Sequence, residues 1–301
     1  MKSRAATTSS WSPIPKGWSS VNYAGQFPQR LYRYRKLTAG NLEDRIMFEV
    51  IEEKIFLAGA GRLNDPDEGC ISWEFNGSDQ DIHNFWVRKL ALHAPTLTKA
   101  EVEKEARRRT SQVIRESKIL NATVQSSFKS VIDDLVRMAC FTTEPLNSAM
   151  WSHYATWEGT SGIKEHGGIC IEYHGGKSWR SLGLHPVSYG NRRPKVNILS
   201  SDRTKRHQLA KALLVKSSSW RYEQEWRAVA YLTANPPFPA NLEKNSKFCM
   251  PGAVRAVIAG LNATKGMVCR IEKLMKRHGC SVPLRKVERD TMTQELVIVD
   301  L

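Results

Sequence analysis

The sequence predicts an α+β fold built on a mixed or antiparallel sheet. Short alternating segments are typical of strands, and here they are neither evenly interleaved with helices nor followed by a Gly-rich phosphate loop. One long helical pattern, at about 79–137, interrupts them. With 301 residues and 41% hydrophobic composition, the chain has enough apolar material for a sizeable core. We expect a flexible or partner-bound arm over residues 1–28 and a single domain over 29–301 with a helical insertion.

The first half of this domain can be assigned in order. Residues 29–37 alternate and predict a strand, and Asn41 is typical of the cap of a helix over about 42–51. A second strand is expected at 55–58. Residues 62–68 (R-L-N-D-P-D-E) predict a tight turn, because Asn and Asp bond their own backbone and Pro restricts φ. Within the helical block, Thr98 and Glu101 predict a capping box.

The second half returns to short strands with two helices between them. Helices are expected at about 205–215 and 264–278. The expected strands are 139–142, 168–173, 186–189, 226–232, 254–259 and 295–300.

Net charge indicates the class of partner. Forty-five basic and thirty acidic residues give a formal charge of +15 and a pI near 9.7, which favours polyanions, nucleic acid first. The sequence has no long uncharged apolar run, so no membrane binding is expected. Residues 1–20 lack the apolar core of a secretory signal, and the six cysteines are scattered; we expect a cytoplasmic protein with neither a zinc site nor disulfides.

The run W-R-Y-E-Q-E-W-R at 220–227 is the most informative segment. In a strand, Glu223 and Glu225 point to the same side, beside Arg221 and Arg227. Two carboxylates with two guanidinium groups can hold both a sugar hydroxyl and a phosphate. The alternative is a surface ladder of ion pairs, each contributing less than about 1 kcal/mol.

Three other clusters are candidates for chemistry. Alternation at 31–35 (L-Y-R-Y-R) places the arginines opposite the tyrosines; inward arginines would bind an anion, whereas a solvated edge strand would leave them outside. Residues 147–154 (N-S-A-M-W-S-H-Y) predict a short capped helix whose aromatic side chains either stack on a planar ring or are ordinary core. Residues 64–68 either bind a divalent metal or form only a structural turn, and the turn is favoured.

Taken together and in order, these motifs resemble a known family. Their order resembles that of a widespread bacterial domain family of unknown function. The motifs are L-Y-R-Y near the start, L-N-D-P after the first helix, C-F and M-W-S-H-Y in the middle, G-I-C-I-E-Y next and W-x-Y-E-x-E-W-R late. The resemblance extends from about Leu31 to Gly260. The N-terminal arm and most of the helical block lie outside its motifs, and Gly59-Ala60-Gly61-Arg62 departs from the bulkier lead-in to N-D-P.

More distantly, the pattern resembles ADP-ribosyltransferases, which implies a catalytic domain with that fold that uses NAD as a substrate. The resemblance implies Glu225 and Glu223 as catalytic residues, Glu225 beside the ribose and Glu223 toward the acceptor. It implies NAD binding by Tyr32, Arg33, Trp151, Ser152, His153 and Tyr154, with Arg33 on the pyrophosphate. The middle motif departs from the pattern, because Trp151-Ser152-His153-Tyr154 stands where one large branch has Ser-Thr-Ser.

Charge is the only guide to the acceptor. A basic stretch leads into the E-x-E motif, and near it Trp179, Tyr189 and Trp220 are candidates to stack on bases, so we expect RNA or single-stranded DNA to be modified. The alternative is a basic face that keeps the protein in solution or binds an acidic partner. The residues expected to bind nucleic acid are Arg192, Arg193, Lys195, Arg203, Lys205, Arg206 and Arg221.

Such an enzyme would be toxic to its host. By analogy, we hypothesise a toxin or anti-phage effector that is restrained by an antitoxin or chaperone bound to the N-terminal arm. Two other functions remain open. One is a metal-dependent nuclease that uses Asp65, Asp67, Glu68, His153 and Glu225, and the other is a non-catalytic nucleic-acid-binding protein.

Overall fold

A computed structural model of the chain describes residues 27–63, 71–115, 132–134, 136–160, 162–174, 179, 182–191, 194–231 and 246–301. Within these residues the chain divides into two compact units. The smaller takes residues from 59–135 and 190–215, and the larger takes those from 27–58, 136–189 and 216–301. The sequence predicts a single domain over 29–301 with a helical insertion at about 79–137. The structure differs, because the inserted segment shares a unit with strand- and helix-forming residues from 190–215.

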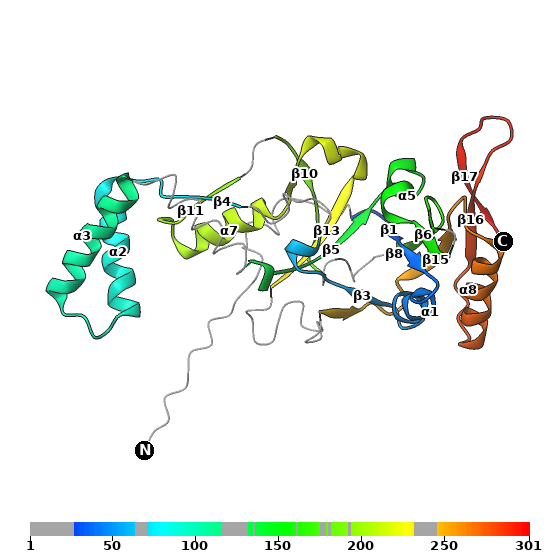
Figure 1. Cartoon of the computed structure of the whole chain (residues 1–301), viewed down its shortest axis with the longest axis horizontal. Coiled ribbons are helices and arrows are strands. Elements are labelled where there is room, and N and C mark those ends of the chain that lie inside the picture. The colour runs from blue at the N-terminus through cyan, green and yellow to red at the C-terminus, as the bar shows by residue number, and fades with distance from the viewer. Residues whose placement is uncertain are drawn as a thin grey trace, which may run out of the picture. The chain divides into compact units, whose positions relative to one another are not determined.

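The larger unit is an α+β structure around one eight-stranded sheet (Figure 1). The strand order is β17-β16-β15-β8-β1-β5-β13-β9, and every described pair is antiparallel except β15 with β16. The strands are β1 (Arg30–Arg35), β5 (Val136–Thr142), β8 (Ile169–His174), β9 (Leu184–Pro186), β13 (Glu225–Tyr231), β15 (Val254–Ala259), β16 (Leu284–Arg289) and β17 (Leu296–Asp300). The predicted mixed or antiparallel sheet is confirmed; the strand at β16 was not predicted.

Smaller elements complete the larger unit. The helices are α1 (Leu42–Ile46), the π-helical turn η1 (Met47–Ile51), α5 (Ser148–Tyr154), the 3-10 helix η3 (Ser218–Glu223) and α8 (Lys265–Arg277). The short strands are β2 (Leu37–Thr38), β3 (Lys54–Phe56), β6 (Trp157–Gly159), β7 (Gly162–Lys164), β10 (Ser188–Tyr189) and β14 (Lys247–Cys249). At strand β12 (Val215–Lys216) the chain passes from the smaller unit into the larger unit, in which it then continues to its last residue.

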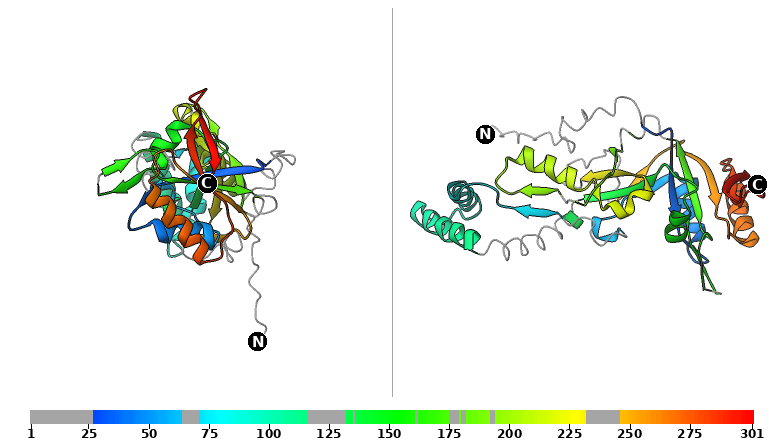
Figure 2. Two further views of the ribbon diagram at one scale, coloured as in Figure 1. Left: turned by 90° about the vertical axis from the view of Figure 1, so that its right-hand side faces the viewer. Right: turned by 90° about the horizontal axis from the view of Figure 1, so that it is seen from above.

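Helices cover both faces of the sheet. On one face, here called the α8 face, α1 and α8 lie side by side (Figures 1 and 2). Their apolar residues, such as Ile46 and Ile271, pack with Leu31 and Val257 of the sheet. On the other, here called the α5 face, Trp151 of α5 packs with residues of β1 and β8. Phe27, the first described residue, packs against Trp226, so the end of the predicted arm joins the core.

The register of β1, β5 and β13 determines which side chains share a face. Tyr32 is paired with Thr142, and Thr142 with Glu225, so these three point to the α5 face. Arg33 points the opposite way, and its guanidinium lies over the ring of Phe141, 5.1 Å from the centroid. The alternation predicted for 31–35 is therefore confirmed. The edge-strand alternative is wrong, because β1 lies between β8 and β5.

A buried charge cluster occupies the α8 face. Glu49 of η1 is fully buried and accepts hydrogen bonds from Arg35 Nε and Arg45 Nη1, each at 2.6 Å. Burial alone would raise the pKa of Glu49, but Arg35, Arg33 and Arg45 outweigh burial and lower the pKa to about 2. Burial, with repulsion from Arg35, lowers the pKa of Arg33 to about 10.

The smaller unit is formed by a helical pair and a short parallel sheet. The helices α2 (Asp79–His93) and α3 (Lys99–Arg115) pack together around Leu90, Val102 and Ala106 (Figure 2). Both have capping boxes; that of α3 joins Thr98 and Glu101, as predicted. The remaining elements are η2 (Ala60–Arg62), β4 (Ser72–Glu74), β11 (Lys195–Asn197) and α7 (Asp202–Ala212), with β4 parallel to β11. The predicted helical pattern at 116–131 lies outside the described residues.

The Glu49 cluster predicts a specific pH dependence of stability. We expect Glu49→Gln to lower the free energy of unfolding at pH 7 by about 3–5 kcal/mol, because it leaves buried guanidinium groups without a counter-charge. The pKa of a glutamate side chain in an unfolded chain is typically about 4.3. The folded-state pKa of Glu49 is about 2, so the wild-type advantage is complete above about pH 4.3 and disappears as the pH falls toward 2.

Urea unfolding at pH 7 and pH 3 measures this difference. Glu43→Gln is the control, because Glu43 lies on the same helical segment with an exposed side chain that pairs only at the surface with Arg270. We expect the control to change stability by less than about 1 kcal/mol. An equal loss for the two variants at pH 7 would contradict the assignment.

Candidate active site

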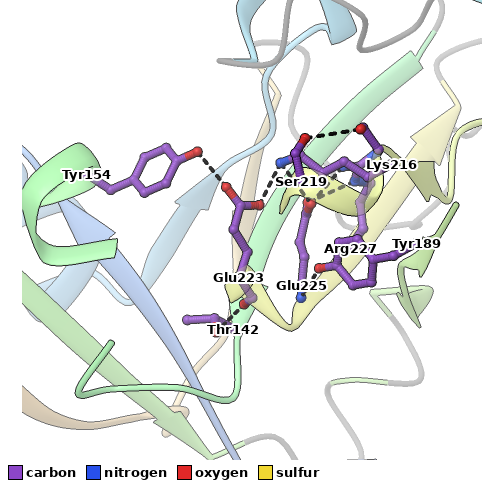
Figure 3. A network of polar contacts seen from close by, with 9 residues as sticks. Thr142, Tyr154, Tyr189, Lys216, Ser219, Glu223, Glu225 and Arg227 are labelled. Atoms are coloured by element: carbon purple, nitrogen blue, oxygen red, sulfur yellow. Dashed lines mark hydrogen bonds and ion pairs between the residues drawn. The ribbon is translucent and has the colours of Figure 1, made fainter. Parts of the chain in front are cut away.

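Two carboxylates converge on one ammonium group on the α5 face (Figure 3). Lys216 Nζ donates to Glu223 Oε2 at 2.5 Å and to Glu225 Oε2 at 3.4 Å. Arg227 holds the second carboxylate with two hydrogen bonds, Nε to Oε1 and Nη2 to Oε2, each at 2.9 Å. All four side chains are at least nine-tenths buried. The cluster therefore contains two negative and two positive groups, with no net charge.

The backbone explains why the two glutamates meet. Glu223 ends the 3-10 helix η3, and Glu225 begins β13. Between them Gln224 adopts the left-handed conformation, with φ 43° and ψ 50°. The pair is therefore not the i, i+2 pair of one strand that the sequence suggests, although both carboxylates do reach the same ammonium. Thr142 Oγ1 donates to the carbonyl of Glu223 at 2.5 Å and holds the end of η3 on β5.

Helix α5 adds a tyrosine to this cluster. Tyr154 Oη donates to Glu223 Oε1 at 2.6 Å, and its side chain is half-buried. Asn147 connects the two motifs, because its Oδ1 accepts from Met150 N at the start of α5 and its Nδ2 donates to the carbonyl of Tyr222 in η3. One residue thus caps the helix and ties it to η3. The middle and late sequence motifs meet through these contacts.

Electrostatics favour an ionised Glu225. Burial opposes its negative charge, but Arg227 and then Lys216 outweigh burial and hold the pKa of Glu225 below its ordinary value. Lys216 also lies over the ring of Trp220, with Nζ 4.7 Å from the centroid. The backbone N–H of Glu225 donates to Tyr189 Oη at 2.7 Å. Tyr189 thereby fixes the first residue of β13.

The other residues expected to bind NAD do not join this cluster. Arg33 is on the α8 face, so the expected site of Arg33, Tyr154 and Glu225 is not formed: adjacent residues of a strand point to opposite faces. Its Nε and Nη1 have no hydrogen-bond partner among the described residues, and Nη2 is 3.4 Å from the carbonyl of Phe56. Tyr32 shares the face of Glu225 and is buried.

The middle motif is mostly core. Trp151 is fully buried, meets Tyr34 edge to face at 5.0 Å and donates Nε1–H to the carbonyl of Pro145 at 2.9 Å, so of the two alternatives for this ring it is ordinary core. Ser152 Oγ is 3.1 Å from His166 Nε2. His153 is exposed, with its ring 6.2 Å from that of Tyr154. Within the part of the chain that the structure describes, Tyr154 is the residue of this motif that forms a hydrogen bond with the acidic pair.

The residues expected to bind nucleic acid lie in both units. Lys195, in the smaller unit, pairs with Glu74 at 2.9 Å, and Arg221, in the larger, lies over the ring of Tyr189 at 5.9 Å. Lys205 is half-buried on α7. Arg192 and Arg193, and the side chains of Arg203 and Arg206, lie outside the described residues. Trp179 is fully buried in the main core, so its expected stacking on bases is wrong.

The metal alternative has little support among the described residues. These contain no group of three or more His, Cys, Asp and Glu placed to hold an ion. Asp65, Asp67 and Glu68 lie outside them, as do residues 1–26 of the arm. The five cysteines in the described part are free thiols. Across the same residues no helix combines the length and apolarity that crossing a membrane requires.

Sequence reasoning gives Lys216 and Thr142 no role, and it predicts Tyr189 only as a ring that stacks on bases and Asn147 only as part of a capped helix. Lys216 carries a usable signal, because it directly follows the apolar run Leu213-Leu214-Val215 and is therefore a candidate for a buried lysine. The other three act through long-range contacts that local patterns do not contain.

Comparison of the sequence with protein families, with curated proteins and with solved structures finds no match.

The shared ammonium predicts a recoverable loss of stability. We expect Lys216→Met to reduce the free energy of unfolding by about 3–5 kcal/mol, because the two buried carboxylates lose their common counter-charge. Adding Glu223→Gln should recover a large part of that loss, since Glu225 and Arg227 then remain as a neutral pair. Chemical unfolding of the two single variants and the double variant measures the coupling.

Lys265→Met serves as the control, because Lys265 is an exposed residue at the start of α8. It should leave stability within about 0.5 kcal/mol of the wild type. Strictly additive effects of Lys216→Met and Glu223→Gln would show that the ammonium does not link the two carboxylates.

Proposed function

We propose that the larger unit is an ADP-ribosyltransferase that splits the nicotinamide–ribose bond of NAD and transfers ADP-ribose to nucleic acid. One observation carries this proposal: Glu223 and Glu225 share the ammonium of Lys216, and Glu223 also receives the hydroxyl of Tyr154. Buried carboxylates with specific charge partners, such as this pair, are frequent at catalytic sites. The resemblance of the E-x-E and M-W-S-H-Y motifs to this enzyme class supports the same function.

The proposed chemistry uses each carboxylate once. As the bond from ribose C1′ to the nicotinamide nitrogen breaks, its electron pair leaves with nicotinamide and positive charge develops on the sugar. The ionised Glu225 stabilises that charge. A nucleophilic oxygen or nitrogen of the acceptor forms the new bond to C1′, and its proton passes to Glu223. Tyr154 is the half-buried member of the cluster, so in this proposal its side chain moves aside when substrate reaches the two acids.

The pyrophosphate contact requires a different arginine from the one that the sequence suggests. Arg33 is on the opposite face of the sheet from Glu225. Arg30, two residues before Tyr32 on β1, shares the face of Tyr32, and its side chain is 63% exposed. It also lies 3.5 Å from the buried carboxylate of Glu172. We assign the phosphate contact to Arg30, because an exposed guanidinium can bind phosphate through two hydrogen bonds.

A metal-dependent nuclease is the second candidate, and one observation favours it. The carboxylates of Glu223 and Glu225 converge on one cationic group, the ammonium of Lys216, and carboxylates are the ligands that Mg²⁺ takes in nucleases. Against it, Arg227 already binds both oxygens of Glu225. Strand cleavage that requires Mg²⁺ and stops with a chelator would favour the nuclease.

The proposal predicts transfer of label from NAD. Purified protein is incubated with labelled NAD and, separately, with RNA, single-stranded DNA and lysate protein. We expect label on nucleic acid with the wild type, and a loss of at least about 100-fold with Glu223→Gln or Glu225→Ala, as for removal of a general acid or base. Glu158→Gln is the control, because Glu158 is a surface residue that pairs with Lys36.

Each outcome separates the candidates. Label on protein alone would keep the transferase and remove the nucleic-acid acceptor. No release of nicotinamide with any acceptor would overturn the transferase. Circular dichroism of both glutamate variants ensures that a loss of activity is not a loss of fold.

A further inference from the structure

The smaller unit contains a hollow of about 260 Å³ that has no part in the acidic cluster. Its walls come from α2 and from the segments that follow β4 and β11, and all of its lining residues belong to this unit. Most of these residues are polar. A small polar hollow suits a ligand that is recognised by hydrogen bonds rather than by apolar burial.

One wall is a single face of α2. Asp81, Asn84 and Arg88 stand at positions i, i+3 and i+7, so their side chains follow one another along the helix. The first and last are separated by about 10.5 Å along the axis, at 1.5 Å per residue. The wall therefore presents a carboxylate, an amide and a guanidinium in that order.

Each of these groups keeps a free hydrogen-bonding position. Ser78 N and Oγ both donate to Asp81 Oδ2, at 2.9 and 2.6 Å, which leaves Oδ1 as an acceptor. Gln80 Nε2 donates to Asn84 Oδ1 at 3.0 Å, which leaves the Asn84 amino group as a donor. Arg88 makes no hydrogen bond or ion pair within the described part of the chain. An acceptor, a donor and a cation thus remain available.

A second wall is held by Asn197. Its Oδ1 accepts from the backbone N–H groups of Asn76 and Leu199, at 3.1 and 3.0 Å, and its Nδ2 donates to the carbonyl of Asn76 at 2.7 Å. These bonds join the ends of β4 and β11. Leu199 is the one apolar residue among those that line the hollow. It gives the face of a planar ligand an apolar contact beside the polar groups of α2.

We propose that this hollow binds one unpaired nucleotide of RNA or single-stranded DNA. The base edge lies against Asp81 and Asn84, the base face on Leu199 and a phosphate at Arg88. An acceptor beside a donor complements a base that presents an amino group beside a ring acceptor, which is the pattern of adenine and cytosine. The inference rests on the proposed nucleic-acid acceptor and names a contact for it.

Binding of fluorescent 12-nucleotide strands, measured by anisotropy without NAD, tests the site. The probes are oligo(A), oligo(C) and oligo(U) RNA and oligo(dA). We expect Arg88→Ala to weaken binding of oligo(A) at least tenfold. Lys89→Ala, on the same helix, also removes one exposed positive charge but from outside the hollow, and it should change affinity by less than twofold.

A second variant tests recognition of the base. The wild type should bind oligo(A) or oligo(C) more tightly than oligo(U), and Asn84→Ala should reduce this preference. Equal losses for Arg88→Ala and Lys89→Ala, or competition by polyglutamate as strong as that by oligo(A), would overturn the proposal, because either result indicates charge attraction alone. Similar affinity for oligo(A) and oligo(dA) would show that the site recognises the base and the phosphate. A large difference would show which of the two nucleic acids, RNA or single-stranded DNA, is the ligand.

The two proposals fail separately. Release of nicotinamide from NAD, assayed without nucleic acid, should be the same for Arg88→Ala and the wild type. If nicotinamide release is absent while base-selective binding persists, the transferase is wrong and the nucleotide site stands. If release occurs but no strand binds, the nucleotide site is wrong and the transferase stands.

Discussion

The antiparallel register of β1, β5 and β13 is the constraint on which the arrangement of charge in the larger unit depends. It places Tyr32, Thr142 and Glu225 in one row on the α5 face, and it places Arg33 and Phe141 on the other. Because side chains alternate along a strand, a shift of one residue would exchange these two sets. The register therefore determines that the central strands carry two separate buried charge clusters, one on each face.

These two clusters differ in composition. On the α8 face, Glu49 is surrounded by Arg33, Arg35 and Arg45, so positive groups are in excess. On the α5 face, Lys216 and Arg227 match Glu223 and Glu225, and the charges balance. Within the described residues, only the second cluster includes a half-buried hydroxyl, that of Tyr154, which donates a hydrogen bond to the carboxylate of Glu223. That hydroxyl connects the buried acids with the less buried surface of α5.

Local patterns in the sequence predict the elements well and the site only in part. The alternation of β1, the capping box of α3 and the limits of β15 follow from short-range signals, and the structure has them. The face of Arg33 relative to Glu225 does not follow, because it depends on the pairing of β1 with β5 and of β5 with β13, strands that are far apart in the sequence. The convergence of Glu223 and Glu225 was expected for a strand, yet it is produced by the left-handed Gln224. Burial of Trp151 and Trp179 was also decided by tertiary packing, which aromatic spacing does not reveal.

The physical cost of the α5-face cluster argues that it has a role beyond stability. Taking four charged groups out of water carries a desolvation penalty of several kcal/mol for each ion, which their mutual attraction offsets only with good geometry. Apolar residues of similar volume are often as stable in such positions. The hydrogen bonds of Thr142, Asn147 and Tyr189 hold the backbone of the η3–β13 turn, so the backbone at the glutamates is supported independently of their charges. A turn that is already fixed by neutral hydrogen bonds does not need buried ions for its geometry, and this supports our proposal that the two carboxylates take part in chemistry.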